Sequence, residues 1–300
     1  MQLPIIRYRN LWFAFSAVLV AAAAAGLLMY GLKFGIDFTG GSLLEVKFAG
    51  SVPQISDINA KFEEFGVKDA VIQTVGDNGA IARMSDLNEQ AHTELLGRLE
   101  QAYPGLTEQR FETVGPTVGD ELRRSAMWSL ALVLMAIALY IAYAFRKVNR
   151  PVASWKYGVV TLVTSVLHDV LIPVGVFAYL GKYLNVEMNS SLVAALLTIL
   201  GFSVHDTVVV CDRIRENLLR TGGKFEEIVE RSVNETLSRS INTTMTAFLP
   251  LLAIFVYGGL SLKWFALALI IGLVSGTYSS IFLVAPLLVV MEKGQSAARR

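Results

Sequence analysis

Hydrophobic residues along this chain gather in six long runs. Each run is long enough to cross about 30 Å of hydrocarbon as an α-helix. The first run follows Arg7 and Arg9 and could be a signal peptide, but it is longer than a typical h-region, so we interpret it as an uncleaved anchor. The pattern therefore predicts six membrane-spanning helices, at residues 11–30, 126–145, 157–180, 191–211, 240–258 and 264–290.

One polar stretch, residues 31–124, is long enough to form a domain. Alternating hydrophobic residues predict strands there, and apolar residues three and four apart predict helices. Their order, βαββαβ, is the α+β ferredoxin-like plan. This fold hosts many functions, so it decides none by itself. The strands are predicted at 43–48, 70–75, 80–84 and 110–114, and the helices at 55–65 and 88–103.

Composition agrees with a membrane protein. The chain is 54% hydrophobic and 17% charged, whereas a soluble domain has about 25% charged residues. The net charge of +1 gives no indication of nucleic-acid binding. The single cysteine, Cys211, excludes an internal disulfide and is interpreted as a small apolar core residue.

The sequence lacks the motifs that indicate nucleotide binding or zinc binding. The segment 221–224 lacks the spacing of a nucleotide-binding loop, and no histidines and cysteines have zinc-ligand spacing. His92 lies on the polar side of its predicted helix and is interpreted as a solvated surface residue. We therefore expect no bound cofactor or metal and no enzymatic activity.

Basic residues predict the orientation, because cytoplasmic loops carry an excess of lysine and arginine. On the opposite side, the short loops hold only Lys182 and Lys263. Both termini (residues 1–10 and 291–300) and the loop 212–238 are then cytoplasmic, and the domain 31–124 is outside. The residues behind this assignment are Arg7, Arg9, Arg146, Lys147, Arg150, Lys156, Arg213, Arg215, Arg220, Lys224, Arg231, Lys293, Arg299 and Arg300.

Two His-Asp dipeptides lie inside predicted spans. A charged group at that depth costs a few kcal/mol or more and usually marks a functional site. At 1.5 Å per residue, His168-Asp169 lies about 17 Å into the third span and His205-Asp206 about 22 Å into the fourth. Adjacent helical residues point about 100° apart, so at most one member of each pair should face the bundle axis.

Arg239, at the start of the fifth span, is the natural counter-ion for Asp206. It shares a helical face with Asn242, Thr243 and Thr246, which predicts a hydrated seam between the fourth and fifth spans. A nearby arginine favours the charged carboxylate and desolvation favours the neutral one. A group balanced between them can take up and release protons.

Structural interpretations compete with this proton pathway. Asp206 and Arg239 could form an ion pair that only holds two helices together. For His168 and Asp169, pathway and packing are equally balanced, and the case for His205 is weaker. The charged residues at 212–216 are interpreted as anchors at a helix end. Residues 225–237 are interpreted as an amphipathic helix on the surface. The small residues Gly272, Gly276 and Ser280, four apart, are interpreted as a face for helix packing.

These motifs together resemble the SecF family of the bacterial SecDF preprotein translocation complex, within the RND-type transporters. The resemblance covers nearly the whole chain. It rests on the segments 34–41, 114–119, 167–170, 203–210, 212–217 and 237–243.

The resemblance implies a function and partners. SecF has six spans and works with SecD, so this chain, with only one six-span half, should need that partner. The complex is held to use the proton-motive force for late preprotein translocation and release outside the cytoplasmic membrane, with the SecYEG channel, the SecA motor and, as a further candidate, YajC. In the family, the residues matching Asp206 and Arg239 are held to be needed for proton-driven function. His205 departs from the asparagine expected there, which puts its role in question.

Two other functions remain open from the sequence. One is an RND-type half that exports small molecules or lipids. The other is a membrane assembly scaffold that transports nothing, in which the buried charges only fix packing.

Overall fold

The computed structural model describes residues 3–145 and 154–298. Arg146, Lys147, Arg150, Arg299 and Arg300, used above for orientation, lie outside the described residues. The chain divides into two compact units, one formed by residues 1–33 with 128–300 and the other by residues 34–127. The boundaries of the smaller unit differ by three residues at each end from the predicted domain 31–124.

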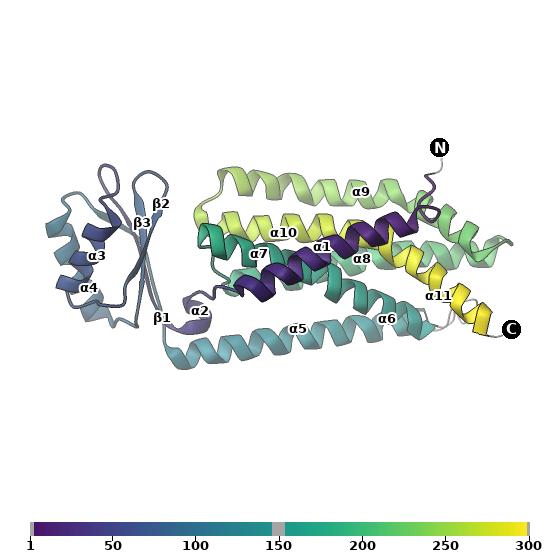
Figure 1. The fold of residues 1–300 in the computed structure, drawn as a ribbon, viewed down its shortest axis with the longest axis horizontal. Helices are drawn as coiled ribbons and strands as arrows, with labels where there is room; N and C mark the ends of the chain where they lie inside the picture. Colours follow the sequence, from purple (N-terminus) through teal and green to yellow (C-terminus); the bar gives the residue numbers. More distant parts are fainter. Residues whose placement is uncertain (1–2, 146–153, 299–300) are drawn as a thin grey trace. The chain divides into compact units, whose positions relative to one another are not determined.

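The smaller unit is a four-stranded antiparallel sheet with helices (Figure 1). Its strand order, β2-β3-β1-β4, and its βαββαβ succession confirm the predicted ferredoxin-like plan. A short helix precedes the first strand. The elements are α2 (Ile36–Thr39), β1 (Gly41–Lys47), α3 (Ile55–Glu64), β2 (Val71–Val75), β3 (Gly79–Met84), α4 (Glu89–Ala102) and β4 (Thr107–Val114).

The core of this unit lies between the sheet and its two longer helices. Leu44 of β1 packs with Ile58 and Phe62 of α3 and with Leu99 of α4, and all four are buried. The sheet thus buries one face against α3 and α4. His92 of α4 is not the solvated residue that its position predicted, because it stacks on the Phe111 ring with 3.7 Å between ring centroids.

Two consecutive glycines connect α2 to β1. Gly40 and Gly41 have φ angles of 73° and 117°, which L side chains rarely adopt. A Cβ on Gly41 would lie 2.7 Å from the Met84 carbonyl oxygen, and one on Gly40 would lie 2.9 Å from the Pro116 Cα. This part of the sequence therefore needs glycine for both conformation and space.

The larger unit is helical, and the described residues of the chain contain six candidate membrane spans. Helix α5 begins in the smaller unit and continues into this one. Two spans contain a π-helical segment, a wider turn that is common at functional sites. The elements are α1 (Arg9–Tyr30), α5 (Pro116–Ala144), α6 (Ser154–Thr164), η1 (Ser165–Val170), α7 (Leu171–Leu184), α8 (Ser190–Arg220), α9 (Phe225–Tyr257), α10 (Leu260–Ser279), η2 (Ser280–Val284) and α11 (Ala285–Ala298).

The residues predicted as a surface amphipathic helix, 225–237, are helical and bury Ile228, Val229 and Val233, but they are not separate from the fifth span. These residues form the first part of α9, which continues without a break into the fifth span. No glycine or proline occurs between Lys224 and Pro250 that would end a helix there. The polar loop between the fourth and fifth spans is accordingly short, because α8 also extends to Arg220.

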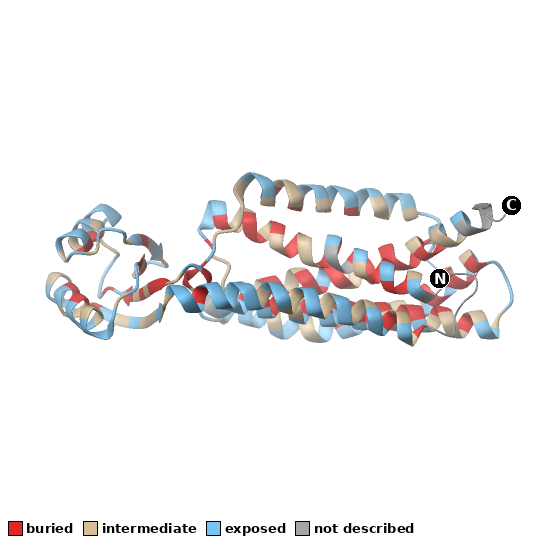
Figure 2. Cartoon of the chain, turned by 90° about the horizontal axis from the view of Figure 1, so that it is seen from below, coloured by how far each residue is buried: buried red, intermediate tan, exposed pale blue. Residues whose placement is uncertain are grey.

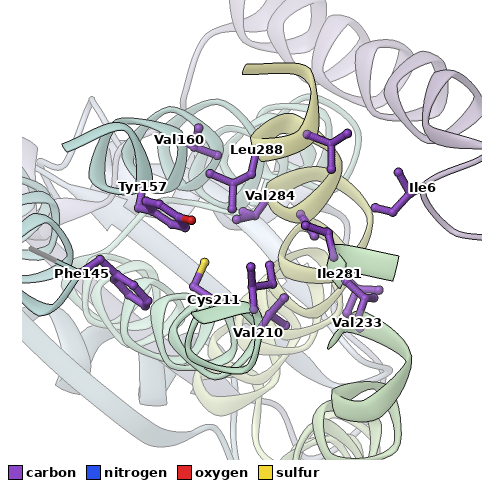
Figure 3. Packing of buried hydrophobic residues seen from close by; sticks show 14 of the residues in the cluster. Ile6, Phe145, Tyr157, Val160, Val210, Cys211, Val233, Ile281, Val284 and Leu288 are labelled. Carbon is purple, nitrogen blue, oxygen red and sulfur yellow. The ribbon is translucent and has the colours of Figure 1, made fainter. Parts of the chain in front are cut away.

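Helices α8 and α10 occupy the interior of the helical unit, while α1, α5 and α9 are mostly exposed (Figure 2). A hydrophobic cluster near the end of α8 includes Cys211, which is 1% exposed, as expected for an apolar core residue (Figure 3). Close packing of α10 on α8 confirms the predicted small-residue row. A Cβ on Gly272 would lie 2.3 Å from the Ile199 side chain, and one on Gly276 would lie 2.9 Å from the Ser203 Cβ.

Candidate proton-coupling site

Polar side chains are buried together where the interior helices meet. They come from η1, α8, α9, α10 and η2, all of which belong to the apolar spans. Serine and threonine hydroxyls surround two carboxyl groups. The buried members are His168, Asp169, Ser203, Asp206, Thr207, Thr244, Ser275, Ser279 and Ser280.

Asp169 is the more buried of the two acidic residues, with 0% of its surface exposed. Its Oδ2 accepts hydrogen bonds from the Ser203 hydroxyl of α8 and from the Ser279 hydroxyl of α10, the latter at 3.0 Å. Burying a carboxyl group in this way requires hydrogen-bond partners, because the unpaired group would cost several kcal/mol. Asp169 therefore joins three spans through one side chain.

His168 faces the interior as well. Its Nδ1 lies 3.1 Å from Asp169 Oδ1 and 3.1 Å from the Ser275 hydroxyl oxygen, while its Nε2 is buried without a hydrogen-bond partner among the described residues. The prediction that at most one member of this pair faces inward is wrong. Both residues lie in the π-helical segment η1, which packs against α8, α10 and α1 and is therefore enclosed on more than one face.

Asp206 of α8 faces α9 and α10. Its Oδ2 accepts a hydrogen bond from the Thr277 hydroxyl at 3.1 Å, and that hydroxyl lies 2.6 Å from the Thr244 hydroxyl of α9. Beside it is a cavity of about 10 Å³, which Thr243 also lines. This is close to the smallest volume that can hold one water molecule.

His205 is exposed, although its neighbour Asp206 is buried. Here the regular α-helix keeps adjacent side chains on different faces, as predicted. Asp206 is the buried member of this pair, while the exposed His205 lines the edge of the small cavity beside it.

Arg239 does not pair with Asp206 in this structure. Among the described residues, the two form no ion pair, and Arg239 is exposed together with Asn242, Thr243 and Thr246. The predicted seam between the fourth and fifth spans is therefore wrong for most of this stripe, because only Thr243 reaches the small cavity. The buried face of α9 instead carries a row of hydroxyl residues four apart, which are Ser232, Thr236, Ser240 and Thr244.

Charged residues beyond the apolar part of α8 tie it to α9. Arg213 Nε lies 2.6 Å from Glu235 Oε2, and Asn217 donates hydrogen bonds to Glu235 at 2.8 Å and to Ser232 at 3.0 Å. These contacts do more than anchor one helix end, because they join two helices. They fix the ends of α8 and α9 that lie nearest their connecting turn.

Several members of this site were missed in the sequence. Ser203, Thr277 and Ser279 donate hydrogen bonds to the carboxyl groups, and Ser275 contacts His168, but single hydroxyl residues are common in membrane helices. The available signal was the run 275–280, where five of six residues carry a hydroxyl group and the sixth is glycine, within an otherwise apolar span. No group of three or more histidine, cysteine or acidic side chains in the described residues could hold a metal ion.

Comparison with known proteins places this chain in a family. The family described as protein export membrane protein SecD/SecF, C-terminal, matches residues 96–294, and the SecD/SecF GG motif matches residues 25–52. Protein translocase subunit SecF of Thermobaculum terrenum is 41% identical, over 97% of this chain and 94% of that protein. Protein translocase subunit SecF of Anaerolinea thermophila is 37% identical, over 98% of this chain and 96% of that protein.

A solved structure agrees with the sequence matches. The crystal structure of SecDF, a translocon-associated membrane protein from Thermus thermophilus, is similar with a TM-score of 0.84 and 35% identity. The similarity covers 98% of this chain and 39% of the SecDF chain, so this chain spans about two fifths of the longer protein. The agreement of family, full-length relatives and fold shows that the chain belongs to the SecD/SecF family of protein export membrane proteins.

Proposed function

We propose that this chain is the SecF subunit of a SecDF complex that uses the proton-motive force to assist late preprotein translocation and release. The observation that carries the proposal is the pair of buried carboxyl groups, Asp169 and Asp206, inside the spans of a chain similar to SecF proteins over nearly its full length. In this proposal, the chain is a transport subunit rather than an enzyme.

The buried cluster has the chemistry that proton coupling needs. Hydroxyl groups can both donate and accept hydrogen bonds, so Thr244 and Thr277 can rearrange as Asp206 gains or loses a proton. One charge crossing the membrane potential releases about 2.3 kcal/mol per 100 mV. That energy is comparable to the few kcal/mol that separate two conformations of a protein.

The exposed polar stripe on α9 supports a membrane partner. Arg239, Asn242 and Thr246 are exposed in the single chain, yet they belong to a candidate membrane span. Arginine facing lipid is costly, so polar residues in spans usually face other protein segments. We propose that the SecD subunit covers this stripe and supplies the contacts that Arg239 lacks here.

Further partners follow from the proposed role. The complex would cooperate with the SecYEG channel, the SecA motor and, as a further candidate, YajC, with the preprotein as substrate. The chain would lie in the bacterial cytoplasmic membrane with both termini inside and the βαββαβ unit outside, on the basic-residue pattern. The roles of Asp206, Arg239, Asn242, Thr243, His205, His168 and Asp169 in a proton pathway are part of this proposal.

A vesicle experiment tests the proposal. Asp206→Asn and Asp169→Asn are compared with Asp212→Asn, whose carboxylate lies on the same helix as Asp206 but is exposed and paired with Arg215 at 2.7 Å. Preprotein translocation is measured in inverted membrane vesicles containing the partner subunit, with and without a proton-motive force. We expect the two buried variants to lose the stimulation by the proton-motive force. Asp212→Asn should retain it, because exposed ion pairs contribute little.

The same experiment separates the alternatives. If Asp206→Asn assembles with its partner and translocation still responds fully to the proton-motive force, the buried charges act only in packing, as in a scaffold. The named relatives do not favour a small-molecule exporter. Export of hydrophobic compounds without an effect on preproteins would nevertheless overturn the proposed function.

A further inference from the structure

Four consecutive residues of α10 and η2, 277–280, form hydrogen bonds with α8, η1 and α1. Thr277 donates to Asp206 of α8, and Ser279 donates to Asp169 of η1. Ser280 shares a hydrogen bond with Thr207 of α8. Tyr278 lies between them and is the member of this run that contacts α1.

The Tyr278 ring packs against the buried polar pair. Its ring stacks on the His168 imidazole, with 5.5 Å between centroids and 18° between planes. His168 in turn contacts Asp169 at 3.1 Å. Because the two rings are stacked, a shift of the His168 imidazole displaces the Tyr278 ring.

The Tyr278 hydroxyl binds α1. It donates a hydrogen bond to the Trp12 carbonyl oxygen at 3.0 Å and accepts one from the Ser16 hydroxyl at 3.3 Å. Ser16 is a buried polar residue, 6% exposed. Tyr278 also stacks on Phe282, whose ring contacts the tilted Trp12 ring with 4.6 Å between centroids, and this adds a second contact to the same part of α1.

We infer that Tyr278 is a positioning residue that transmits changes at the His168–Asp169 pair to α1, the helix whose C-terminal end leads into the βαββαβ unit. The inference rests on the proposed function and adds a route by which the His168–Asp169 pair acts on α1. When Asp169 gains a proton, its charge-assisted hydrogen bonds from Ser203 and Ser279 weaken. His168 is then free to shift, and the stacked Tyr278 ring carries that shift to Trp12 and Ser16.

The surroundings of the pair contain few other ionisable groups. Among the described residues, the titratable group in contact with Asp169 is His168 of its own segment, and Tyr278 of α10 stacks on that imidazole. Helix α8 presents Ser203 to Asp169. Asp206, one turn further along α8, is hydrogen-bonded to Thr277 instead. The α1 contact of Tyr278 therefore belongs to the Asp169 side of the site.

The test uses variants that separate the hydroxyl from the ring. Tyr278→Phe keeps the stack on His168 and removes both hydrogen bonds to α1, while Ser16→Ala removes one of them from the other helix. Tyr179→Phe is the matched control, because the Tyr179 hydroxyl also donates to a backbone oxygen of α1, that of Ala22 at 3.0 Å, and no contact of Tyr179 reaches His168 among the described residues.

Translocation is measured in vesicles with the partner subunit, beside wild type and Asp206→Asn. We expect Tyr278→Phe to reduce the stimulation by the proton-motive force at least fivefold, because two hydrogen bonds are lost and one alone corresponds to roughly fivefold. The rate without a proton-motive force and assembly with the partner should not change. If Asp206→Asn loses stimulation while Tyr278→Phe matches Tyr179→Phe, the inference fails and the proposed function stands.

A spectroscopic readout tests the route without translocation. Spin labels at Leu28→Cys and Leu262→Cys, on exposed positions of α1 and α10, report the separation of the two helices. Cys211 is buried and does not compete for the labels. We expect Asp169→Asn to shift the label distance, and Tyr278→Phe to remove that shift. A shift that persists in full with Tyr278→Phe overturns the inference, even if wild type shows no response to the proton-motive force.

Discussion

Gly276 of α10 lies directly against Ser203 of α8, so that a Cβ on the glycine would stand 2.9 Å from the Ser203 Cβ. Ser203 is also the residue whose hydroxyl donates to the buried Asp169. The close packing of two helices and the hydrogen bonding of a buried carboxyl group therefore depend on the same pair of positions. A larger residue at position 276 must therefore displace the Ser203 hydroxyl as well as helix α8.

Gly276→Ala is expected to destabilise the protein by about 1–3 kcal/mol, the usual cost of adding volume to a packed core. Gly201→Ala is the control, because a Cβ there meets nothing within 4 Å. On a helix interior, that change should be neutral or stabilising by about 0.5–1 kcal/mol. Thermal unfolding of both variants in detergent checks this. Equal unfolding temperatures for the two would contradict the packing argument.

The exposed stripe of α9 gives a prediction about the proposed partner. A cysteine at Asn242 should form cross-links to SecD in membranes, because this polar position needs protein rather than lipid around it. Val18→Cys on α1 is a control at an apolar position that is 66% exposed and can face lipid. The measurement is the yield of a mixed product after treatment with a thiol cross-linker. Efficient cross-linking from Val18 alone would place the partner elsewhere.

A carboxylate in the βαββαβ unit predicts a pH effect outside the spans. The Ser85 hydroxyl, and then the Ser85 backbone N–H at 2.8 Å, hold the pKa of Asp69 below its ordinary value. A carboxyl group with a lowered folded-state pKa adds stability above its unfolded value, about 3.9, and loses that contribution as the pH falls through the lower folded value.

We therefore expect the Ser85 amide of the wild-type protein to be protected from hydrogen exchange near pH 5 and to lose protection at lower pH. Asp69→Asn should show weak protection with little dependence on pH across this range. Ser85→Ala is the control, because it removes the hydroxyl but keeps the backbone donor and should retain part of the pH dependence. Identical profiles for wild type and Asp69→Asn would rule out this contact as the cause.

Regular elements followed from the sequence because their signals are periodic. The six spans and the βαββαβ order depend on runs and alternation of apolar residues, and such signals survive without knowledge of neighbours. The inward direction of Asp206 likewise followed from regular helical geometry. The continuity of α9 from Phe225 could have been predicted from the absence of a helix-breaking residue, but the polar composition of its first part suggested a separate element.

The details of the site depended on tertiary contacts that periodicity does not report. His168 and Asp169 are both buried, against the expectation, because the segment 165–170 packs against α8, α10 and α1. The face of α9 that carries Arg239 is polar, and this suggested a seam with α8. Small hydroxyl residues such as Thr244 fit the close contact instead, whereas the long arginine side chain lies outside it. Sequence patterns identified the charged residues but not which helices their side chains face.

The segment before α1 provides the last prediction. The Glu230 carboxylate of α9 accepts hydrogen bonds from the backbone N–H groups of Ile5 at 2.5 Å and Ile6 at 2.9 Å, and both isoleucine side chains are buried in the core. Glu230→Ala removes this charged acceptor from both donors, while Ile5 keeps its hydrogen bond to the Leu3 carbonyl oxygen at 2.9 Å. Hydrogen bonds to a charged group contribute about 1.5–3 kcal/mol. We expect faster amide exchange at Ile5 and Ile6 and a lower unfolding temperature.

Glu227→Ala is the matched control for that change, since Glu227 is an exposed acidic residue of the same helical turn. It removes the same charge from the first part of α9 without touching the N-terminal segment. If charge alone stabilised this end of α9, the two variants would behave alike. A selective effect of Glu230→Ala on the exchange of Ile5 and Ile6 would instead show that this carboxylate holds the start of α1 against α9, because no other acceptor in the described residues binds both N–H groups.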